Sequence, residues 1–311
     1  MYGCLRCRTL FSCKRPTLVG VNKHLYYLSI LFILLTSCRK APKYPVSCDF
    51  FNPTNDYFTI INNNDSPERA FNVFCKKVNV FGVMIYATEN VVDKDLLHAA
   101  NVMAQYLDNN EDSIIDNQLV LDEMVKNQAA MVLFGTENSK NQRAAFNSVR
   151  KIEDQYDFQD LYGSEIHPNW NYDSPFDATY EEILHIITHS GYSKVYPDIF
   201  GEQKGSQLAN CMDLARGGQF TNIPSSYPTV AWYSYDDNTC EYECQVTEYF
   251  YWALTSLLGA QDYSARYDEI SHEWKANTPA LLQSMDSAVY ELLTDTLYHL
   301  PSVLPDGSYV R

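Results

Sequence analysis

Two histidines one helical turn apart are the residues of this sequence best suited to metal chemistry. His185 and His189 stand four positions apart in the segment EEILHIITH, residues 181–189. On an α-helix, residues at this spacing lie on one face, and two imidazoles so placed can share one zinc ion. The pattern therefore predicts a helix that carries two zinc ligands. The alternative is a structural role, in which the same histidines cap a core or pair with carboxylates such as Glu181.

This segment resembles the H-E-x-x-H helix of the zincin metallopeptidases. Ile186 stands where that family has its general-base glutamate. The resemblance therefore implies zinc ligands at His185 and His189 but supplies no base. Glu182 lies on the same stripe three residues before His185, so we expect it to act as the base or to orient the imidazole. Glu181 is the next candidate, and without any base a zinc site loses much of its advantage.

A third zinc ligand is expected from a downstream helix. In zincins whose third ligand is a glutamate, that residue lies on a helix tens of residues after the histidine pair. Glu248 follows the second histidine by 59 residues and suits this position, with Glu243 as the competing candidate. The layout is similar to that of zincins related to the anthrax lethal factor catalytic domain. That resemblance implies an oxyanion-stabilising tyrosine before the glutamate, a role for Tyr242 or Tyr235.

An acidic loop at residues 108–116 has the spacing of a calcium site. Oxygen-bearing side chains occupy its positions 1, 3, 5 and 9, namely Asp108, Asn110, Asp112 and Asp116. The loop is similar to the front of an EF-hand. Ser113 replaces the usual glycine and Leu119 the bidentate glutamate, so Asp122 or Glu123 would have to close the site. We expect a structural calcium clip, and the alternative is a polar turn without an ion.

The elements that position these residues follow from hydrophobic periodicity. An N-terminal α/β unit is predicted, followed by a mainly helical part of zincin-like character, which makes the fold class α+β. An edge strand near 161–168 would suit a peptide substrate lying antiparallel to it. Strands are expected at 78–88 and 129–134, and helices at 93–107, 117–127, 140–149, 177–190, 203–216, 241–258, 264–276 and 279–294.

The first 37 residues have the form of a secretory signal. Residues 1–24 contain five cations and no acid, and an apolar run of 11 residues follows at Leu25–Leu35. This run is too short to span a bilayer, which takes roughly 20 residues. The sequence Leu35-Thr36-Ser37-Cys38 resembles the lipobox of bacterial lipoproteins. It implies an exported protein that a lipid on Cys38 anchors to a membrane, facing the periplasm or the cell exterior.

Charge and cysteine content fit export. Removing residues 1–37, which hold five cations and no acid, changes the net charge from −16 to −21. Such a surface repels nucleic acid and favours divalent cations. Five cysteines follow Cys38, so at least one thiol cannot pair within the chain. Cys240 and Cys244 lie four apart, and Cys48 and Cys75 flank one segment.

The predicted domains are a signal peptide at 1–37, a tether and irregular segment at 38–77, an α/β unit at 78–160 and a zincin-like metal-binding domain at 161–311. The first functional hypothesis is a membrane-tethered zinc metallopeptidase-like protein that hydrolyses extracytoplasmic peptides. The second is a non-catalytic surface lipoprotein with a calcium-stabilised fold, which would bind a partner and keep its histidine pair as a structural or relic feature.

Overall fold

The computed structural model describes residues 57–63, 66, 68–137, 140–168 and 175–310. The predicted signal peptide and Cys38 lie outside these ranges. A five-stranded mixed sheet has the strand order β1-β2-β3-β4-β5. The first three strands pair antiparallel, and β3, β4 and β5 pair parallel. The strands are β1 (Ile61–Asn62), β2 (Lys76–Val80), β3 (Val83–Ala87), β4 (Ala130–Phe134) and β5 (Phe158–Tyr162).

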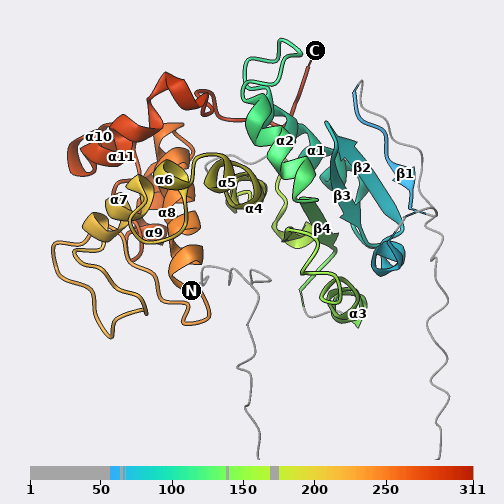
Figure 1. Cartoon of the computed structure of the whole chain (residues 1–311), viewed down its shortest axis with the longest axis horizontal. Coiled ribbons are helices and arrows are strands. Elements are labelled where there is room, and N and C mark those ends of the chain that lie inside the picture. Colours follow the sequence, from blue (N-terminus) through green and yellow to red (C-terminus); the bar gives the residue numbers. More distant parts are fainter. Residues whose placement is uncertain (1–56, 64–65, 67, 138–139, 169–174, 311) are drawn as a thin grey trace, which may run out of the picture.

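The helices pack on both faces of this sheet and extend beyond it (Figure 1). The N-terminal ones are η1 (Arg69–Val73), α1 (Asp93–Leu107), α2 (Gln118–Lys126), α3 (Lys140–Val149) and η2 (Gly163–Glu165). The central ones are α4 (Thr179–Ile187), η3 (Thr188–Tyr192), α5 (Ser193–Val195), α6 (Pro197–Phe200) and α7 (Gln207–Ala215). The C-terminal ones are α8 (Tyr242–Leu257), α9 (Ser264–Ile270), α10 (Pro279–Met285), α11 (Ser287–Leu293) and η4 (Thr296–Tyr298).

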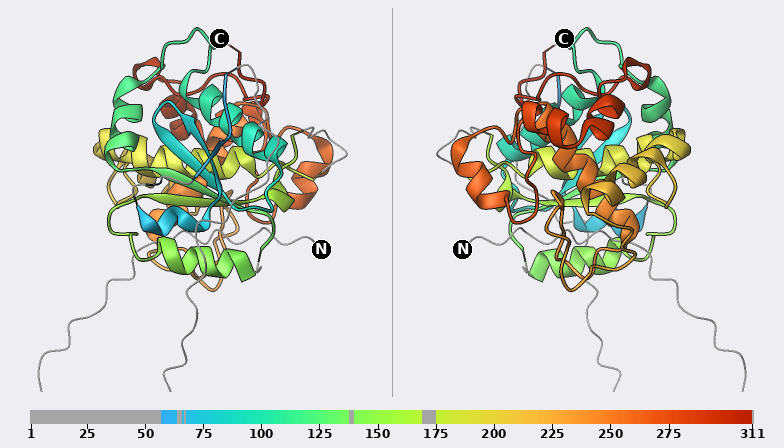
Figure 2. Two further views of the ribbon diagram at one scale, coloured as in Figure 1. Left: turned by 90° about the vertical axis from the view of Figure 1, so that its right-hand side faces the viewer. Right: turned by 90° about the vertical axis from the view of Figure 1, so that its left-hand side faces the viewer.

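Side chains alternate between the two faces of the sheet, as the period of a strand requires. In β4, Met131 and Leu133 join the larger core together with α1 and α4. Val132 and Phe134 join a smaller core with η1 and α3. Figure 2 shows α3 on one side of the sheet, with the C-terminal helices on the other. The sheet is thus covered on both faces, and α4 lies between it and α8 (Figure 1).

The larger core crosses the predicted domain boundary at residue 160. It runs from Phe58 through the sheet to Tyr309 near the C-terminus. The segment predicted as a tether up to residue 77 also contributes structure, since it holds β1 and η1 and buries Phe71 and Phe74. The described residues therefore form a mixed α/β fold around a shared core, which confirms the mixture of strands and helices predicted from the sequence.

Helix α1 has the predicted bounds, and α2 and β4 begin one residue after theirs. The predicted strand at 78–88 is instead a hairpin of β2 and β3. Phe81 and Gly82 form its turn, both with positive φ (54° and 107°). Two-residue hairpin loops favour this conformation because it matches the strand twist. The Asn79 side chain accepts a hydrogen bond from the Gly82 amide at 2.7 Å and holds the turn.

Two further sequence predictions need correction. The edge strand expected at 161–168 is β5 at Phe158–Tyr162, and a 3₁₀ turn follows it. The helix expected at 279–294 is divided into α10 and α11 at Asp286. This buried residue caps α11 by accepting from the Val289 amide, and it also accepts from Tyr249 at 2.6 Å and Trp232 at 2.8 Å. Satisfying a buried carboxylate outweighs one helical turn.

No helix among the described residues is long and apolar enough to cross a membrane.

Candidate metal centre

Helix α4 carries the histidine segment into the interior. Its apolar residues Ile183, Leu184, Ile186 and Ile187 are almost fully buried against the sheet and α1. The side chain of Asp177 accepts from the Thr179 amide at 3.0 Å and stabilises the helix start. Because the helix is buried on several sides, His185 is buried too, with 2% of its side chain exposed. The position of Ile186, where a zincin has its base, is a core position here.

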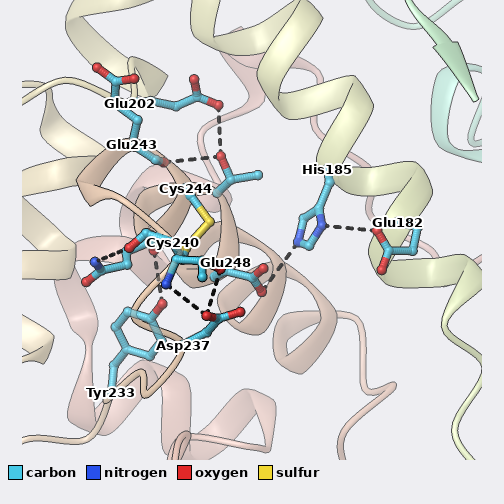
Figure 3. The surroundings of a disulfide bond; sticks show 12 residues. Glu182, His185, Glu202, Tyr233, Asp237, Cys240, Glu243, Cys244 and Glu248 are labelled. Atoms are coloured by element: carbon cyan, nitrogen blue, oxygen red, sulfur yellow. Dashed lines mark hydrogen bonds and ion pairs between the residues drawn. A yellow bond between two sulfur atoms is a disulfide. The ribbon is translucent and has the colours of Figure 1, made fainter. Parts of the chain in front are cut away.

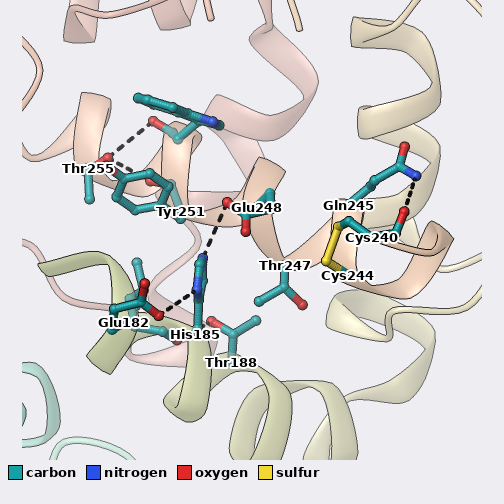
Figure 4. Close-up of polar contacts among 12 residues, drawn as sticks. Glu182, His185, Thr188, Cys240, Cys244, Gln245, Thr247, Glu248, Tyr251 and Thr255 are labelled. Carbon is teal, nitrogen blue, oxygen red and sulfur yellow. Dashed lines mark hydrogen bonds and ion pairs between the residues drawn. A yellow bond between two sulfur atoms is a disulfide. The ribbon is translucent and has the colours of Figure 1, made fainter. Parts of the chain in front are cut away.

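The His185 ring lies between two carboxylates (Figure 4). Its Nδ1 is 3.6 Å from Oε2 of Glu182 on the same helix, and its Nε2 is 3.6 Å from Oε2 of Glu248 on α8. Both separations exceed hydrogen-bond length. Tyr251, one turn after Glu248, meets the imidazole edge to face with ring centroids 5.8 Å apart. The structure therefore brings together three of the predicted site residues, His185, Glu182 and Glu248.

One group of three side chains has the spacing of metal ligands among the described residues. Glu181, Glu182 and His185 each offer one ligand atom, and these atoms lie within 4.8 Å of one another. The predicted set of His185, His189 and Glu248 does not form such a group. The helical turn that was expected to supply two histidines thus supplies one histidine and two carboxylates.

His189 is directed elsewhere for a physical reason. After Ile187 the helix widens into the π-helical turn η3, so His189 does not continue the regular face of α4. Its Nδ1 lies 2.8 Å from Oε2 of Glu202, a buried residue between α6 and α7. Thr247 donates to the same carboxylate at 2.8 Å. Burial lowers the pKa of His189, but the charge of Glu202 and its hydrogen bond together raise the pKa above the ordinary value. Glu202 thus links η3 to α8 through His189 and Thr247.

The carboxylates around His185 repel one another. Burial raises the pKa of Glu182 well above its ordinary value, and the charges of Asp160 and Glu248 raise it further. Burial and then Glu182 raise the pKa of Glu181 to about 7. Burial, Glu182 and Asp160 raise the pKa of Glu165 to about 8. A site of this charge would be stabilised by a proton or by a metal cation.

Helix α8 presents Glu248 from a firmly held first turn (Figure 3). A disulfide joins Cys240 to Cys244, one turn before Glu248. The side chain of Gln245 donates to the Cys240 carbonyl at 3.0 Å and accepts from the buried Arg216 at 2.6 Å. These contacts fix where α8 begins and therefore where Glu248 points. Cys75 is also disulfide-bonded, and Cys211 is a buried free thiol, which agrees with the odd cysteine count.

The tyrosines predicted for the oxyanion role have other partners. Tyr242 donates to Asp213 at 2.9 Å, and the Arg216 guanidinium lies 5.2 Å from its ring centroid. Tyr235 is buried, and its carbonyl accepts from Tyr227. Glu243, the competing ligand, is exposed on the first turn of α8. The aromatic residue that contacts His185 is Tyr251, and the sequence signal for it was its spacing of three residues from Glu248.

Asp160 and Glu165 are the carboxylates that sequence reasoning missed. Asp160 is buried in β5 and Glu165 ends the 3₁₀ turn after it. An aspartate at a buried strand position is unusual, but the strand predicted at 161–168 begins one residue after Asp160, so no sequence signal pointed to it. Gln159 of the same strand donates to Oε2 of Glu182 at 2.5 Å. Strand β5 therefore supplies part of the charge and of the support around His185.

The acidic loop keeps part of the conformation of an EF-hand. Asp108 accepts from the amides of Asp112 and Ser113, both at 3.1 Å. Ser113 has φ 75°, the left-handed conformation for which the EF-hand uses glycine. Asn110 accepts from the Asp112 amide, and Asp116 accepts from the Asn109 amide at 2.6 Å. The loop is thus ordered by its own side chains.

The loop also binds the C-terminal segment. Tyr309 donates to Asp108 at 2.5 Å, the Val310 amide to Glu111 at 2.6 Å, and the Ser302 amide to Asn109 at 2.9 Å. Within the described residues, Asp108, Asp112 and Asp116 do not form a group with mutual ligand distances of 4.8 Å or less. The carboxylate of Asp108 is occupied by protein donors.

No protein-family model, no curated protein and no solved structure matches the chain. The geometry of the residues around His185 is therefore the basis on which a function is assigned.

Proposed function

We propose that this protein is a zinc-dependent, metallopeptidase-like hydrolase whose ion is held by His185, Glu182 and Glu181. The observation that carries the proposal is the convergence of these three ligand atoms within 4.8 Å on one turn of α4, with His185 buried and the two glutamates half-buried. Nitrogen and carboxylate oxygen are both ligands of zinc, with bonds near 2 Å. Two ligands of one ion then lie about 3 to 4 Å apart, and His185 Nδ1 lies 3.6 Å from Glu182 Oε2.

The surrounding charges favour a cation at this position. Two charged groups act on the pKa of Glu182. They are Asp160 and Glu248, and both are negative. Glu182 is only 15% exposed, so water screens this repulsion poorly. A divalent ion would offset the repulsion, whereas the other reading of the histidine, a structural ion pair, would leave three carboxylates facing one another.

The other residues have supporting roles in this proposal. Glu248 faces Nε2 of His185 and can accept its proton, which would fix the tautomer that presents Nδ1 to the ion. The ion would polarise a carbonyl and lower the pKa of a bound water. Glu165, with a pKa of about 8, holds a proton near neutral pH and is the acid–base candidate in place of the absent zincin glutamate. The proposal therefore keeps the zinc-dependent hydrolysis that the zincin resemblance implies, but assigns different residues as zinc ligands.

Peptides are the proposed substrates. Strand β5 is at the edge of the sheet and contributes Asp160 and Gln159 to the site, so a peptide added alongside it would lie near the ion. Disulfides at Cys240–Cys244 and at Cys75 suit an oxidising compartment. Export and lipid attachment at Cys38 remain part of the proposal. Mass spectrometry of the protein from membranes, compared with Cys38→Ser, tests that attachment.

Metal analysis of the purified protein tests the proposed centre. We expect one zinc per chain, lost in His185→Ala and retained in His189→Ala, because His189 is bound to Glu202. The two substitutions are matched in chemistry, but His185 faces Glu182 and Glu248 whereas the more exposed His189 faces Glu202. Retention of zinc by His185→Ala would exclude this centre. Loss of zinc from both variants with the fold intact would restore the histidine pair as the ligand set. Peptide cleavage should fall with Glu165→Gln at unchanged zinc content.

The acidic loop carries a second proposal, a calcium clip in a non-catalytic surface protein. The left-handed Ser113 and the amides bound by Asp108 support it. Calcium–oxygen bonds of 2.3–2.6 Å would require Asp112 and Asp116 to approach Asp108. Thermal unfolding with and without calcium is the test. The calcium site is supported if calcium raises Tm in the parent protein and in Asp154→Ala, a control in another turn, but not in Asp112→Ala. If calcium does not raise Tm in the parent, the site is excluded.

A further inference from the structure

A cavity of about 550 Å³ lies outside the proposed ligand set. Its wall is formed by the segment between α7 and α8 and by the turn after α9. It contains aromatic, hydroxyl and carboxylate groups, and a ligand would meet Tyr227, Tyr235, Asp236, Asn238, His272 and Glu273. Tyr235 and Glu273 are buried at the wall, whereas Asp236, Asn238 and His272 are exposed.

The chemistry of this lining selects for a cation. Two tyrosine rings offer the electron-rich faces that attract guanidinium and ammonium groups within about 6 Å. Asp236 and Glu273 supply negative charge. Arg216, whose charge and side-chain hydrogen bond act on Tyr227, is buried, and its own charge is paired with Asp213 at 2.5 Å. The strongly acidic chain, with a net charge of −16, raises the local concentration of cations in general.

Glu273 connects the cavity to the proposed metal centre. Its Oε1 accepts from the indole nitrogen of Trp252 at 3.1 Å. Trp252 lies on α8 four residues after Glu248, so the two side chains share one side of that helix. Glu273 is also one of the carboxylates whose charge acts on Glu181. One helix therefore carries both a residue facing His185 and the residue that anchors the wall of the cavity.

We propose that this cavity is a subsite for an arginine or lysine side chain of the substrate. Its role in substrate choice rests on the proposed peptidase function; the binding of a cationic side chain does not. The guanidinium would lie against Tyr227 or Tyr235 with its charge toward Glu273 and Asp236. This predicts a peptidase that prefers basic residues near the scissile bond.

Binding of small probes tests the subsite without any chemistry. The full mature protein is titrated by NMR with Nα-acetyl-arginine amide and with its neutral isostere Nα-acetyl-citrulline amide. We expect the arginine probe to bind at least about tenfold more tightly, since a charge-assisted contact is worth about 1.5–3 kcal/mol. Glu273→Gln keeps an acceptor for Trp252 and should abolish the preference; Asp154→Asn, an exposed acid in another turn, should keep it.

Each outcome separates the subsite from the metal centre. Equal binding of the two probes, or an arginine preference that survives Glu273→Gln and Asp236→Asn together, overturns the subsite whatever the zinc content. A preference lost in Glu273→Gln supports it even if the protein holds no zinc. If the protein cleaves peptides, Glu273→Gln should lower kcat/KM for arginine-containing peptides about tenfold and leave that for citrulline-containing peptides unchanged.

Discussion

The acidic loop at 108–116 and the carboxylates around His185 are both rich in acid, but they handle their charge in opposite ways. In the loop, Asp108 is fully buried and accepts from two amides and from Tyr309. Around His185, burial and then the charges of Asp160 and Glu248 raise the pKa of Glu182. Both segments contain several acidic residues close together in the sequence. This pattern does not distinguish a carboxylate that is hydrogen-bonded by the protein from one that favours a cation.

The difference follows from what faces each carboxylate. Backbone amides and a hydroxyl stabilise the charged form of an aspartate. A buried glutamate that faces other glutamates is destabilised by burial and by repulsion together. The loop is therefore complete as a structural element, whereas the carboxylates around His185 would be stabilised by a proton or, in the proposed function, by a cation. Five experiments would sharpen or break this comparison.

Removing the central carboxylate of the loop should have the largest effect on stability. Asp108→Ala removes the buried carboxylate that accepts from two backbone amides and from the Tyr309 hydroxyl, and each such loss costs about 1–3 kcal/mol. We expect unfolding in urea to require about 4 kcal/mol less than in the parent protein. Asp122→Ala, an exposed residue on α2, is the control and should change stability by less than about 0.5 kcal/mol. A loss below about 1 kcal/mol for Asp108→Ala would mean that the loop is not structural.

A methyl group at Gly307 should be nearly as damaging. Gly307 has φ 76°, and an added Cβ would lie 2.3 Å from Nδ1 of His98, which pairs with the buried Asp177 at 2.6 Å. Left-handed strain and overpacking together cost about 3 kcal/mol. Thermal unfolding of Gly307→Ala measures this. Gly205→Ala is the matched control, because φ is 99° there and no atom lies within 4 Å of the added Cβ. Equal losses in both would assign the effect to the backbone alone.

In the His185 centre, neutralising a carboxylate should move stability and metal affinity in opposite directions. Glu182→Gln removes a repelled charge, so we expect the metal-free protein to gain about 1 kcal/mol in urea unfolding. Loss of a ligand should lower zinc affinity about 100-fold, measured by competition with a chelator. Asp108→Ala in the loop should only lower stability, so the two substitutions together measure the difference between the two regions. A destabilised Glu182→Gln variant with parental zinc affinity would contradict it.

The two regions should also respond differently to pH, with the smallest expected effect. In the folded protein the pKa of Glu181 is about 7 and that of Glu165 about 8, compared with an ordinary 4.5. As pH rises, the unfolded chain therefore releases these protons at a lower pH than the folded protein does. Their stabilisation is complete below pH 4.5 and is lost as pH rises to about 8. Metal-free protein should therefore lose at least about 1 kcal/mol across this window, and Glu165→Gln with Glu181→Gln should flatten the loss. A flat profile in the parent would contradict the repulsion.

The pair formed by His98 and Asp177 should make stability depend on pH in the opposite direction. Burial opposes the charge of Asp177, but His98 and the contacts with Thr179 lower its pKa below the ordinary 3.8. A lowered carboxyl pKa contributes stability that is present above the unfolded value and lost as pH falls through the folded value. Acid unfolding of His98→Gln should therefore begin at a higher pH than in the parent. An unchanged midpoint would show that the pair is not charged in the folded state.

Local sequence determined much of this protein. Periodicity and caps placed α1, α2, α3 and β4 within a residue of their observed bounds, because these elements are decided by neighbours three or four positions away. The i, i+3 spacing of Glu182 and His185 was sufficient to predict that they share a face, and the cysteine spacing suggested the Cys240–Cys244 bond.

Only the tertiary structure decided which partners the histidines meet. The π turn η3 and the buried Glu202, 13 residues beyond His189, remove that residue from the expected zinc pair. The charges of Asp160 and Glu165 act on each other and on Glu182 because β5 pairs beside β4, an arrangement that no helical spacing encodes. The three proposed ligands lie on one turn of α4, whereas the other carboxylates come from β5, the turn after it and α8. The sequence therefore determined that His185 and Glu182 share a turn, while packing decided which carboxylates surround them and which histidine does not.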